Sequence, residues 1–363
     1  MKFGLFNLMS LWDNPGGVAG VIEDTRVMIG LAEDIGFDIA WFAEHHFTNY
    51  SISPSPLMMA AHFAAKFPKI RVGAAVVVLP LYHPARVAQE IALVDQLSGG
   101  RLVLGVGSGY QAYEFERLGA DVERKTEIFL EYWQVVSQAL LTGQAEYQGQ
   151  YITLPPSVFT LRPRQGVLPE LYITSLHEAV LKQLAPLGAI PFITAGWKGS
   201  PALARIAEDA RRSWRGAGLT DRPMPLAVQQ YIHVTDSRAE ALQAAERARF
   251  VARMIAALRH PNLKLNGARL DPPPLDDERP LEDFRDNLII GDAHYVAERL
   301  AAEIRALRPV HYNGFFQFGD MPIRNAARSL ERFGAEVLPL LGRELGHPGQ
   351  EAGRLFEFDA LAC

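Results

Sequence analysis

The chain has 363 residues, of which 48% are hydrophobic, so it is long enough to bury a large α/β core. Its net charge of −5, with both signs interspersed, excludes the basic face of a nucleic-acid-binding protein and a polybasic membrane anchor. No apolar run approaches the roughly 20 residues that cross a bilayer. The only cysteine, Cys363, excludes an internal disulfide, a thiolate zinc site and a core nucleophile. Residues 1–7 resemble a strand rather than a signal peptide, so we expect a cytoplasmic protein.

Strand and helix patterns alternate along the first half of the chain. We expect strands at Lys2–Leu8, Asp38–Ala43, Ile70–Leu79 and Arg101–Gly107. The helices between them are expected near Val18–Ile35, Leu57–Lys66 and Pro84–Leu97, and a longer helix should end near Leu141. The third of these strands is rich in valine and fully apolar, which is typical of a parallel strand buried on both faces.

The second half continues the alternation, with two interruptions. We expect a β-hairpin at 146–152, and strands at Glu170–Thr174, Ile190–Thr194, Leu226–Val234 and Tyr312–Phe318. Helices are expected near His177–Ala185, Pro201–Arg215, Ser237–Leu258, Ala293–Leu307 and Ile323–Leu340. Residues 260–286, with three consecutive prolines and many acids, predict an irregular insertion. After Gly342 the chain has the composition of a polar extension.

This pattern predicts a closed (β/α)8 TIM barrel, because eight strands are each followed by a helix. We therefore expect one barrel domain at 1–342, with insertions near 143–168 and 259–287, and an extension at 343–363. A doubly wound open sheet is the competing fold. Against it, the first strand is followed by Asn14-Pro15-Gly16-Gly17, and Tyr110 stands where the third glycine of a dinucleotide fingerprint belongs.

Three consecutive ionisable side chains, Glu44, His45 and His46, follow the second predicted strand. Polar groups at the carboxyl end of a barrel strand usually mark the reactive face. Adjacent residues of an extended chain point to opposite faces, so we expect one histidine to face the site and the other to be structural. A zinc site is a weak alternative, because neighbouring histidines chelate one metal poorly and no His-Glu-x-x-His helix is present; we predict no metal. A purely structural histidine–carboxylate cluster is the other alternative.

Several fragments resemble one known family in order and spacing. They are Met1–Gly4, Glu44–Thr48, Val72–Ala75, Leu79-Pro80, His83-Pro84, Asp95–Arg101, Gly105–Gly109, Glu114-Phe115, Arg162-Pro163 and Phe333–Leu340. With these motifs the chain is similar to the bacterial luciferase-like flavin-dependent monooxygenases across nearly its whole length. The resemblance implies a barrel with an insertion after the fourth strand. It also implies reduced FMN (FMNH2) as co-substrate, O2 as oxidant, a peroxyflavin intermediate and a homodimeric assembly.

The same resemblance assigns roles to the candidate residues. His45 resembles the family's catalytic histidine, with Glu44 as its support; the alternative role for His45 is packing against the flavin ring. Ala75-Val76 matches the place of a non-proline cis peptide under the flavin, unless it is an ordinary buried strand. Gly107, Ser108 and Gly109, with the adjacent Tyr110, would let the backbone approach the cofactor, unless they form a plain strand-to-helix turn.

The phosphate contact is less well defined by the resemblance. Light-emitting members of the family carry a cysteine and a phosphate-binding arginine where this chain has Gly107 and Ser108. Thr174, Ser175, His177 and the following helix could bind the phosphate instead, or could merely cap that helix. Arg162 and Arg164 are further candidates.

Aromatic side chains near strand ends indicate an apolar pocket for a hydrophobic small organic substrate, although about half of them should be core residues. They are Phe6, Trp12, Trp41, Tyr50, Tyr82, Tyr110, Trp197, Phe316 and Phe318. Nothing resembles a nicotinamide site, so we expect a separate flavin reductase as partner. The alternatives are a deazaflavin- or flavin-dependent hydride-transfer oxidoreductase of the same superfamily and a non-catalytic flavin-binding paralogue.

Overall fold

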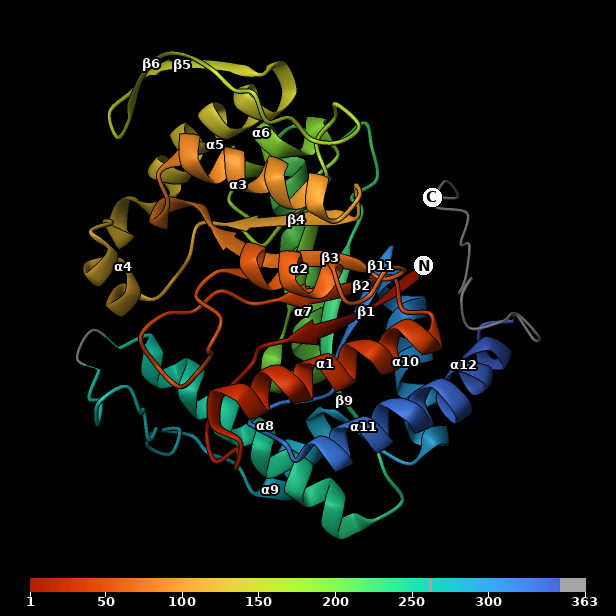
Figure 1. Cartoon of the computed structure of the whole chain (residues 1–363). Helices are drawn as coiled ribbons and strands as arrows, with labels where there is room; N and C mark the ends of the chain where they lie inside the picture. Colours follow the sequence, from red (N-terminus) through yellow and green to blue (C-terminus); the bar gives the residue numbers. More distant parts are fainter. Residues whose placement is uncertain (261–262, 347–363) are drawn as a thin grey trace.

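The computed structural model describes residues 1–260 and 263–346, and its centre is a closed parallel barrel (Figure 1). The barrel strands are β1 (Lys2–Asn7), β2 (Ile39–Phe42), β3 (Arg71–Val78), β4 (Leu102–Gly107), β7 (Glu170–Ile173), β8 (Ile190–Thr194), β9 (Ala227–Val234) and β11 (His311–Phe315). They are hydrogen-bonded in the order β9-β11-β1-β2-β3-β4-β7-β8, and the pairing of β8 with β9 closes the ring. The predicted (β/α)8 barrel is therefore confirmed.

Helices surround the barrel in sequence order (Figure 1). They are α1 (Gly17–Ile35), α2 (Pro56–Ala64), α3 (Pro84–Leu97), α4 (Ala112–Leu118), α5 (Lys125–Thr142), α6 (Glu178–Leu184), α7 (Gly199–Gly216), α8 (Arg238–Leu258), α9 (Leu281–Asn287), α10 (Ala293–Leu307), α11 (Ile323–Arg332) and α12 (Leu338–Glu344). The hairpin after the fourth strand is β5 (Gln144–Gln148) with β6 (Thr153–Val158).

Two expectations about elements were wrong. The long helix predicted to end near Leu141 is two helices, because Gly119 ends α4 in a left-handed conformation and Asp121 caps the next turn. The helix predicted at Ile323–Leu340 is present: α11 and α12 are continuous through a π-helical turn at Phe333–Val337, next to Pro339, which has no N–H to donate. The predicted irregular insertion contains α9, and a short strand, β10 (Ile289–Gly291), pairs with β9.

The barrel interior is filled by large side chains set against small ones. Trp41 is fully buried and contacts Tyr172, with ring centroids 4.9 Å apart. A side chain at Gly73 would place its Cβ 2.4 Å from the Trp41 ring, so only glycine leaves room for this indole. Large-to-small replacement of such a buried tryptophan costs about 3–5 kcal/mol.

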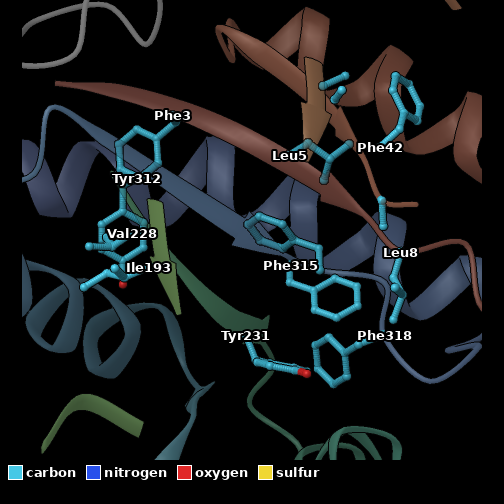
Figure 2. Packing of buried hydrophobic residues seen from close by; sticks show 14 of the residues in the cluster. Phe3, Leu5, Leu8, Phe42, Ile193, Val228, Tyr231, Tyr312, Phe315 and Phe318 are labelled. Carbon is cyan, nitrogen blue, oxygen red and sulfur yellow. The ribbon is translucent and has the colours of Figure 1, made fainter. Parts of the chain in front are cut away.

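The outward faces of the strands pack against the helices through an apolar cluster (Figure 2). On one side of the barrel this cluster is aromatic: Phe3 lies 5.9 Å from Tyr312, and Tyr231 lies 4.9 Å from Phe315 and 5.0 Å from Phe318, measured between ring centroids. This packing fixes where β1, β9 and β11 end, and therefore where their following loops begin.

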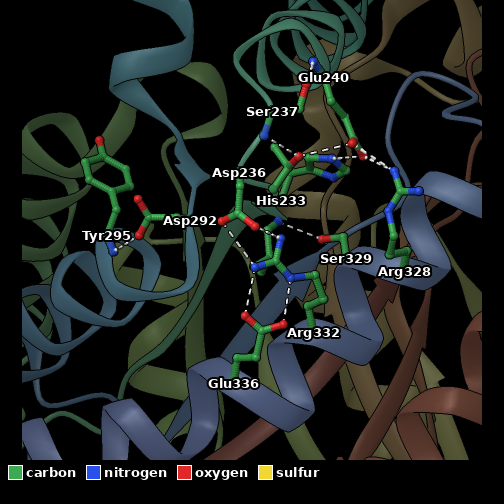
Figure 3. Close-up of polar contacts among 12 residues, drawn as sticks. His233, Asp236, Ser237, Glu240, Asp292, Tyr295, Arg328, Ser329, Arg332 and Glu336 are labelled. Atoms are coloured by element: carbon green, nitrogen blue, oxygen red, sulfur yellow. Dashed lines mark hydrogen bonds and ion pairs between the residues drawn. The ribbon is translucent and has the colours of Figure 1, made fainter.

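A polar network fastens α8 and α11 to the end of β9 (Figure 3). Glu240 accepts from Arg328 and lies 3.2 Å from Nε2 of His233, while the hydroxyl of Ser329 accepts the Val234 N–H at 2.8 Å. His233 is fully buried, and burial lowers its pKa, which favours the neutral imidazole. His233 is therefore a core residue of the barrel wall with a carboxylate partner.

The division into one domain at 1–342 with an extension at 343–363 stays a prediction, and most of that extension, 347–363, lies outside the described residues. Within the described part of the chain, no helix is both long and apolar enough to cross a membrane.

Candidate active site at the carboxyl ends of the strands

The predicted reactive residues follow β2 in a loop that closes on itself. The N–H of His45 donates to the carbonyl of Ser53 (3.0 Å), and the hydroxyl of Ser53 donates to the carbonyl of Ala43 (2.7 Å). The loop is therefore held without regular strand geometry beyond Phe42. This explains why His45 and His46 line the same cavity instead of facing opposite sides as an extended chain would require.

His45 is positioned by Glu114, from the first turn of α4. Its Nδ1 lies 3.2 Å from Oε1 of Glu114, which also accepts the backbone N–H of His46 at 2.7 Å. An ionised carboxylate can only accept, so the contact places the imidazole proton on Nδ1 and leaves Nε2 able to take a proton. The side-chain amide of Gln111 lies 2.9 Å from the same Nδ1, and a proton on Nδ1 requires this amide to present its oxygen, which is buried and has no other partner among the described residues. The ring of Tyr50 packs 4.6 Å away.

A second imidazole–carboxylate pair lies deeper. Nε2 of His46 is 3.0 Å from Oε1 of Glu44, while Oε2 of Glu44 accepts the N–H of Val78 (3.1 Å) and the hydroxyl of Tyr82 (2.9 Å). Burial raises the pKa of Glu44. Burial acts to lower the pKa of His46, but the bond to Glu44 and the negative charges of Glu44 and Glu114 together outweigh this and raise it. Both shifts favour keeping protons on the pair. The hydrogen bond from Val78 to Glu44 joins the loop after β2 to β3.

The structure therefore gives His45 a different carboxylate partner from the one expected. Glu44 contacts His46 and not His45, whereas Glu114, which had no assigned role, contacts His45. The available signal was weak: Glu114 stands in the first turn of the helix after the glycine-rich segment, one of many acids in such positions.

A cavity of about 750 Å³ opens beside the two histidines. Its walls come from the loops after β1 and β2 and from the insertion after α8: Leu11, Trp12, His45, His46, Phe47, Thr48, Asn49, Ser51, Ile52, Pro54, Asn266, Ala268 and Arg269. Of the aromatic candidates, Trp12 lines this cavity, whereas Trp41, Phe316 and Phe318 are fully buried core residues.

Three consecutive strands of the barrel, β3, β4 and β7, bring the expected cofactor residues together. The Ala75–Val76 peptide bond is cis, as the family resemblance implied. A Cβ at Gly107 would lie 2.7 Å from both the Thr174 hydroxyl and the Val76 side chain. Gly107 therefore lets Val76 and Thr174 pack against the backbone of β4, and we call the surface around it, between β3, β4 and β7, the cradle. Ala75, Val76 and Ser108 are partly exposed around it.

The other cofactor candidates surround this cradle. Gly109 has a positive φ of 75°, and the hydroxyl of Tyr110, which is 37% exposed, lies 3.2 Å from the side-chain amide of Gln111. Ser175 and His177 serve as local caps: the Ser175 hydroxyl accepts the His177 N–H, and Nδ1 of His177 accepts the Ala179 N–H. The Thr174 side chain, in contrast, is exposed beside the cradle.

Two loop arginines considered for the phosphate have structural partners. The guanidinium of Arg162 donates to the carbonyls of Leu140 and Leu141. The backbone N–H of Arg164 donates to Asp95 at 2.7 Å. Among the described residues, no group of three or more His, Cys, Asp or Glu side chains is arranged to hold a metal ion.

Comparison with known sequences gives one family. The sequence model described as "Luciferase-like monooxygenase" matches residues 1–309. The chain is 33% identical over 347 residues to an uncharacterized protein, y4vJ, of Sinorhizobium fredii, covering 95% of this chain and 99% of the relative. It is 25% identical to the oxygenase component of the flavin-dependent trigonelline monooxygenase of Acinetobacter baylyi, covering 93% and 95%. It is 31% identical to the alkanal monooxygenase alpha chain of the Kryptophanaron alfredi symbiont, covering 45% and 46%.

Solved structures share the fold at low sequence identity. The monooxygenase RslO1 of Streptomyces bottropensis superposes with a TM-score of 0.78 at 19% identity, covering 93% of this chain and 99% of that one. The oxygenating constituent of 3,6-diketocamphane monooxygenase from Pseudomonas putida, in complex with FMN, gives 0.72 at 19% identity, covering 93% and 98%.

Proposed function

Because the chain belongs to the luciferase-like monooxygenase family, we propose that it is the oxygenase component of a two-component monooxygenase. It uses reduced FMN and O2 to oxygenate a hydrophobic small organic substrate. The observation that carries the proposal is the His45 imidazole, oriented by Glu114 at the edge of a mostly apolar cavity. The relative described as an oxygenase component supports a separate flavin reductase as partner.

The cradle fits the flavin because the side chains at its surface, Ala75, Val76 and Ser108, are small and partly exposed, which gives a flat ring access to the backbone. Ala75, Val76 and Gly107–Tyr110 would hold the ring system, and Thr174 would reach its phosphate, with Ser175 and His177 shaping the turn. When bound, reduced FMN supplies the electrons that activate O2, which side chains cannot provide. The remaining tasks fall to the protein: it must exclude water and place one proton.

His45 is the residue for the proton. With Nδ1 protonated by its bond to Glu114, Nε2 can accept a proton from a reacting group and return it. The apolar walls at Leu11, Trp12 and Ile52 limit water around it. The pair of Glu44 and His46 holds the loop against β3 and thereby keeps His45 beside the cradle. We also propose a cytoplasmic homodimer, as the family resemblance implies.

The test uses the protein mixed anaerobically with reduced FMN and then with O2, with reduced deazaflavin F420 in parallel. We expect bound reduced FMN to be consumed with O2. A His45→Gln variant should bind reduced FMN normally but lose about 10²- to 10⁴-fold in substrate oxygenation, the usual contribution of a general base. Turnover with reduced F420 and none with reduced FMN would establish the hydride-transfer alternative instead. Binding of flavin with no change in any rate in His45→Gln would indicate a non-catalytic paralogue.

A further inference from the structure

The cavity beside His45 has an unbalanced charge. Among the described residues that line it there is one arginine, Arg269, and no aspartate or glutamate. The remaining walls are largely apolar, including Phe47, whose side chain is 45% exposed. A lone cation at the edge of an apolar cavity favours a ligand that carries both an apolar body and a negative charge.

Arg269 is held in place by the turn that carries it. The N–H of Asn266 donates to the Arg269 carbonyl (2.9 Å), and the Arg269 N–H donates back (3.0 Å). The turn is fastened to the reactive loop, because the Asn49 N–H donates to the Ala268 carbonyl (3.0 Å) and the Leu270 N–H donates to Oδ1 of Asn49 (2.8 Å). The guanidinium is therefore presented from a fixed backbone.

The guanidinium keeps bonding capacity. Its Nη1 donates to the carbonyl of Trp12 at 3.0 Å and its Nε to Asp271 at 2.8 Å. In the part of the chain that the structure describes, Nη2 makes no hydrogen bond. The Asp271 side chain is 62% exposed, so water screens its charge and it neutralises Arg269 only weakly. The free edge of a planar guanidinium matches the two oxygens of a carboxylate.

Trp12 gives the cavity a rigid apolar wall. Its ring stacks on Phe250, with centroids 3.8 Å apart and planes 2° apart, and the Arg247 guanidinium lies 4.7 Å from its centroid. Because the Arg269 guanidinium bonds to the carbonyl of this same residue, wall and cation are adjacent.

Building on the proposed function, we propose that the substrate is an apolar monocarboxylate. Its carboxylate pairs with Arg269, its body lies along Trp12 and Phe47, and its far end reaches the side of the cavity formed by His45. A neutral hydrophobic substrate is the alternative that the test must exclude.

The test compares carboxylates with their neutral amides as calorimetric probes of the full chain: benzoate, cinnamate, 4-phenylbutyrate and octanoate against the four corresponding amides. We expect at least one carboxylate to bind about tenfold more tightly than its amide, a difference typical of one paired charge. The preference should vanish in Arg269→Gln and persist in Arg279→Gln, which removes the same charge from an exposed site of the same insertion outside this cavity.

Two further measurements separate the possible failures. Hydrogen exchange at the Leu270 amide must stay slow in Arg269→Gln, which shows that the turn is still docked. Reduced FMN binding is measured in the same samples: if it is absent from the wild type, the proposed function fails. If reduced FMN binds but amides bind as tightly as carboxylates, if no carboxylate binds, or if Arg269→Gln keeps the preference, the carboxylate assignment is wrong.

Discussion

At the scale of single residues, the contact between His45 and Glu114 is the one on which the proposed acid–base role of His45 depends. The sequence could place His45 at the end of a strand, because an apolar run stops there, but it could not identify the partner. Glu114 is 69 positions away along the chain, and only the closed barrel brings the two together. Glu44, adjacent in sequence, instead contacts His46 because the loop leaves extended geometry after Phe42. Local spacing thus indicates candidate residues and does not predict how they pair.

Replacing Glu114 by Gln should change which nitrogen of His45 carries the proton. An amide can donate to Nδ1, so the Nε2–H form becomes available and the base is lost. In ¹⁵N-histidine spectra we expect the Nδ1-protonated signal of the wild type to shift toward Nε2-protonated. Substrate oxygenation should fall by about 10- to 100-fold. Glu116→Gln, an 80% exposed neighbour on α4, is the matched control. An unchanged tautomer in Glu114→Gln would refute the orienting role.

At the scale of elements, the insertion after α8 is the part that sequence patterns describe least well. Its prolines and acids predicted irregular structure, and much of 263–280 is indeed irregular (Figure 1). They did not predict which part of the barrel the insertion contacts. The structure bonds it to the loops after β1 and β2 through Asn49 and Trp12. Each is a single hydrogen bond between a side chain and the backbone of a distant segment, with no periodicity to reveal it. The break after α4 was also missed, because a single glycine, Gly119, ends that helix inside a longer stretch of helical pattern.

Asn49→Ala should release this insertion without unfolding the barrel. The change strands the buried N–H of Leu270, at a local cost of about 1–3 kcal/mol. We expect exchange at the Leu270 amide to quicken by about tenfold or more, and limited proteolysis to cut the insertion sooner. The melting temperature should change little. Asn325→Ala, whose side chain makes no hydrogen bond in the described residues, is the control. Equal protection of Leu270 in both variants would argue against the anchoring role of Asn49.

At the scale of the whole molecule, barrel closure was predictable because strand and helix periods alternate throughout, and each strand buries both faces. What fills the barrel was not. His311, at the start of β11, is fully buried in the interior, with the Tyr172 hydroxyl 3.1 Å from its Nδ1. No sequence pattern distinguishes such a histidine from a surface one. Burial lowers the pKa of His311 to about 4.

This histidine should make stability depend on pH. As pH falls from the ordinary value of 6.5 toward about 4, the unfolded chain binds a proton that folded His311 refuses. The free energy of unfolding therefore decreases over this window, by up to about 3 kcal/mol, and is regained as pH rises. Buried His233 contributes in the same direction. Urea titrations at several pH values in this window give the free energy of unfolding as a function of pH. This free energy should change less with pH in His311→Gln than in the wild type or in His294→Gln, an exposed control. An identical pH dependence would contradict this origin.

The central claim, that the barrel mouth holds a reduced flavin beside His45, is tested most directly by anaerobic calorimetry with reduced FMN. We predict saturable binding of one FMN per chain. Gly107→Val, with its fold checked by circular dichroism, should weaken it by about tenfold or more, because the added side chain would displace Thr174 and Val76, which form part of the cradle. If the wild-type chain released no binding heat with reduced FMN, or if a folded Gly107→Val variant bound it equally well, the account would be contradicted.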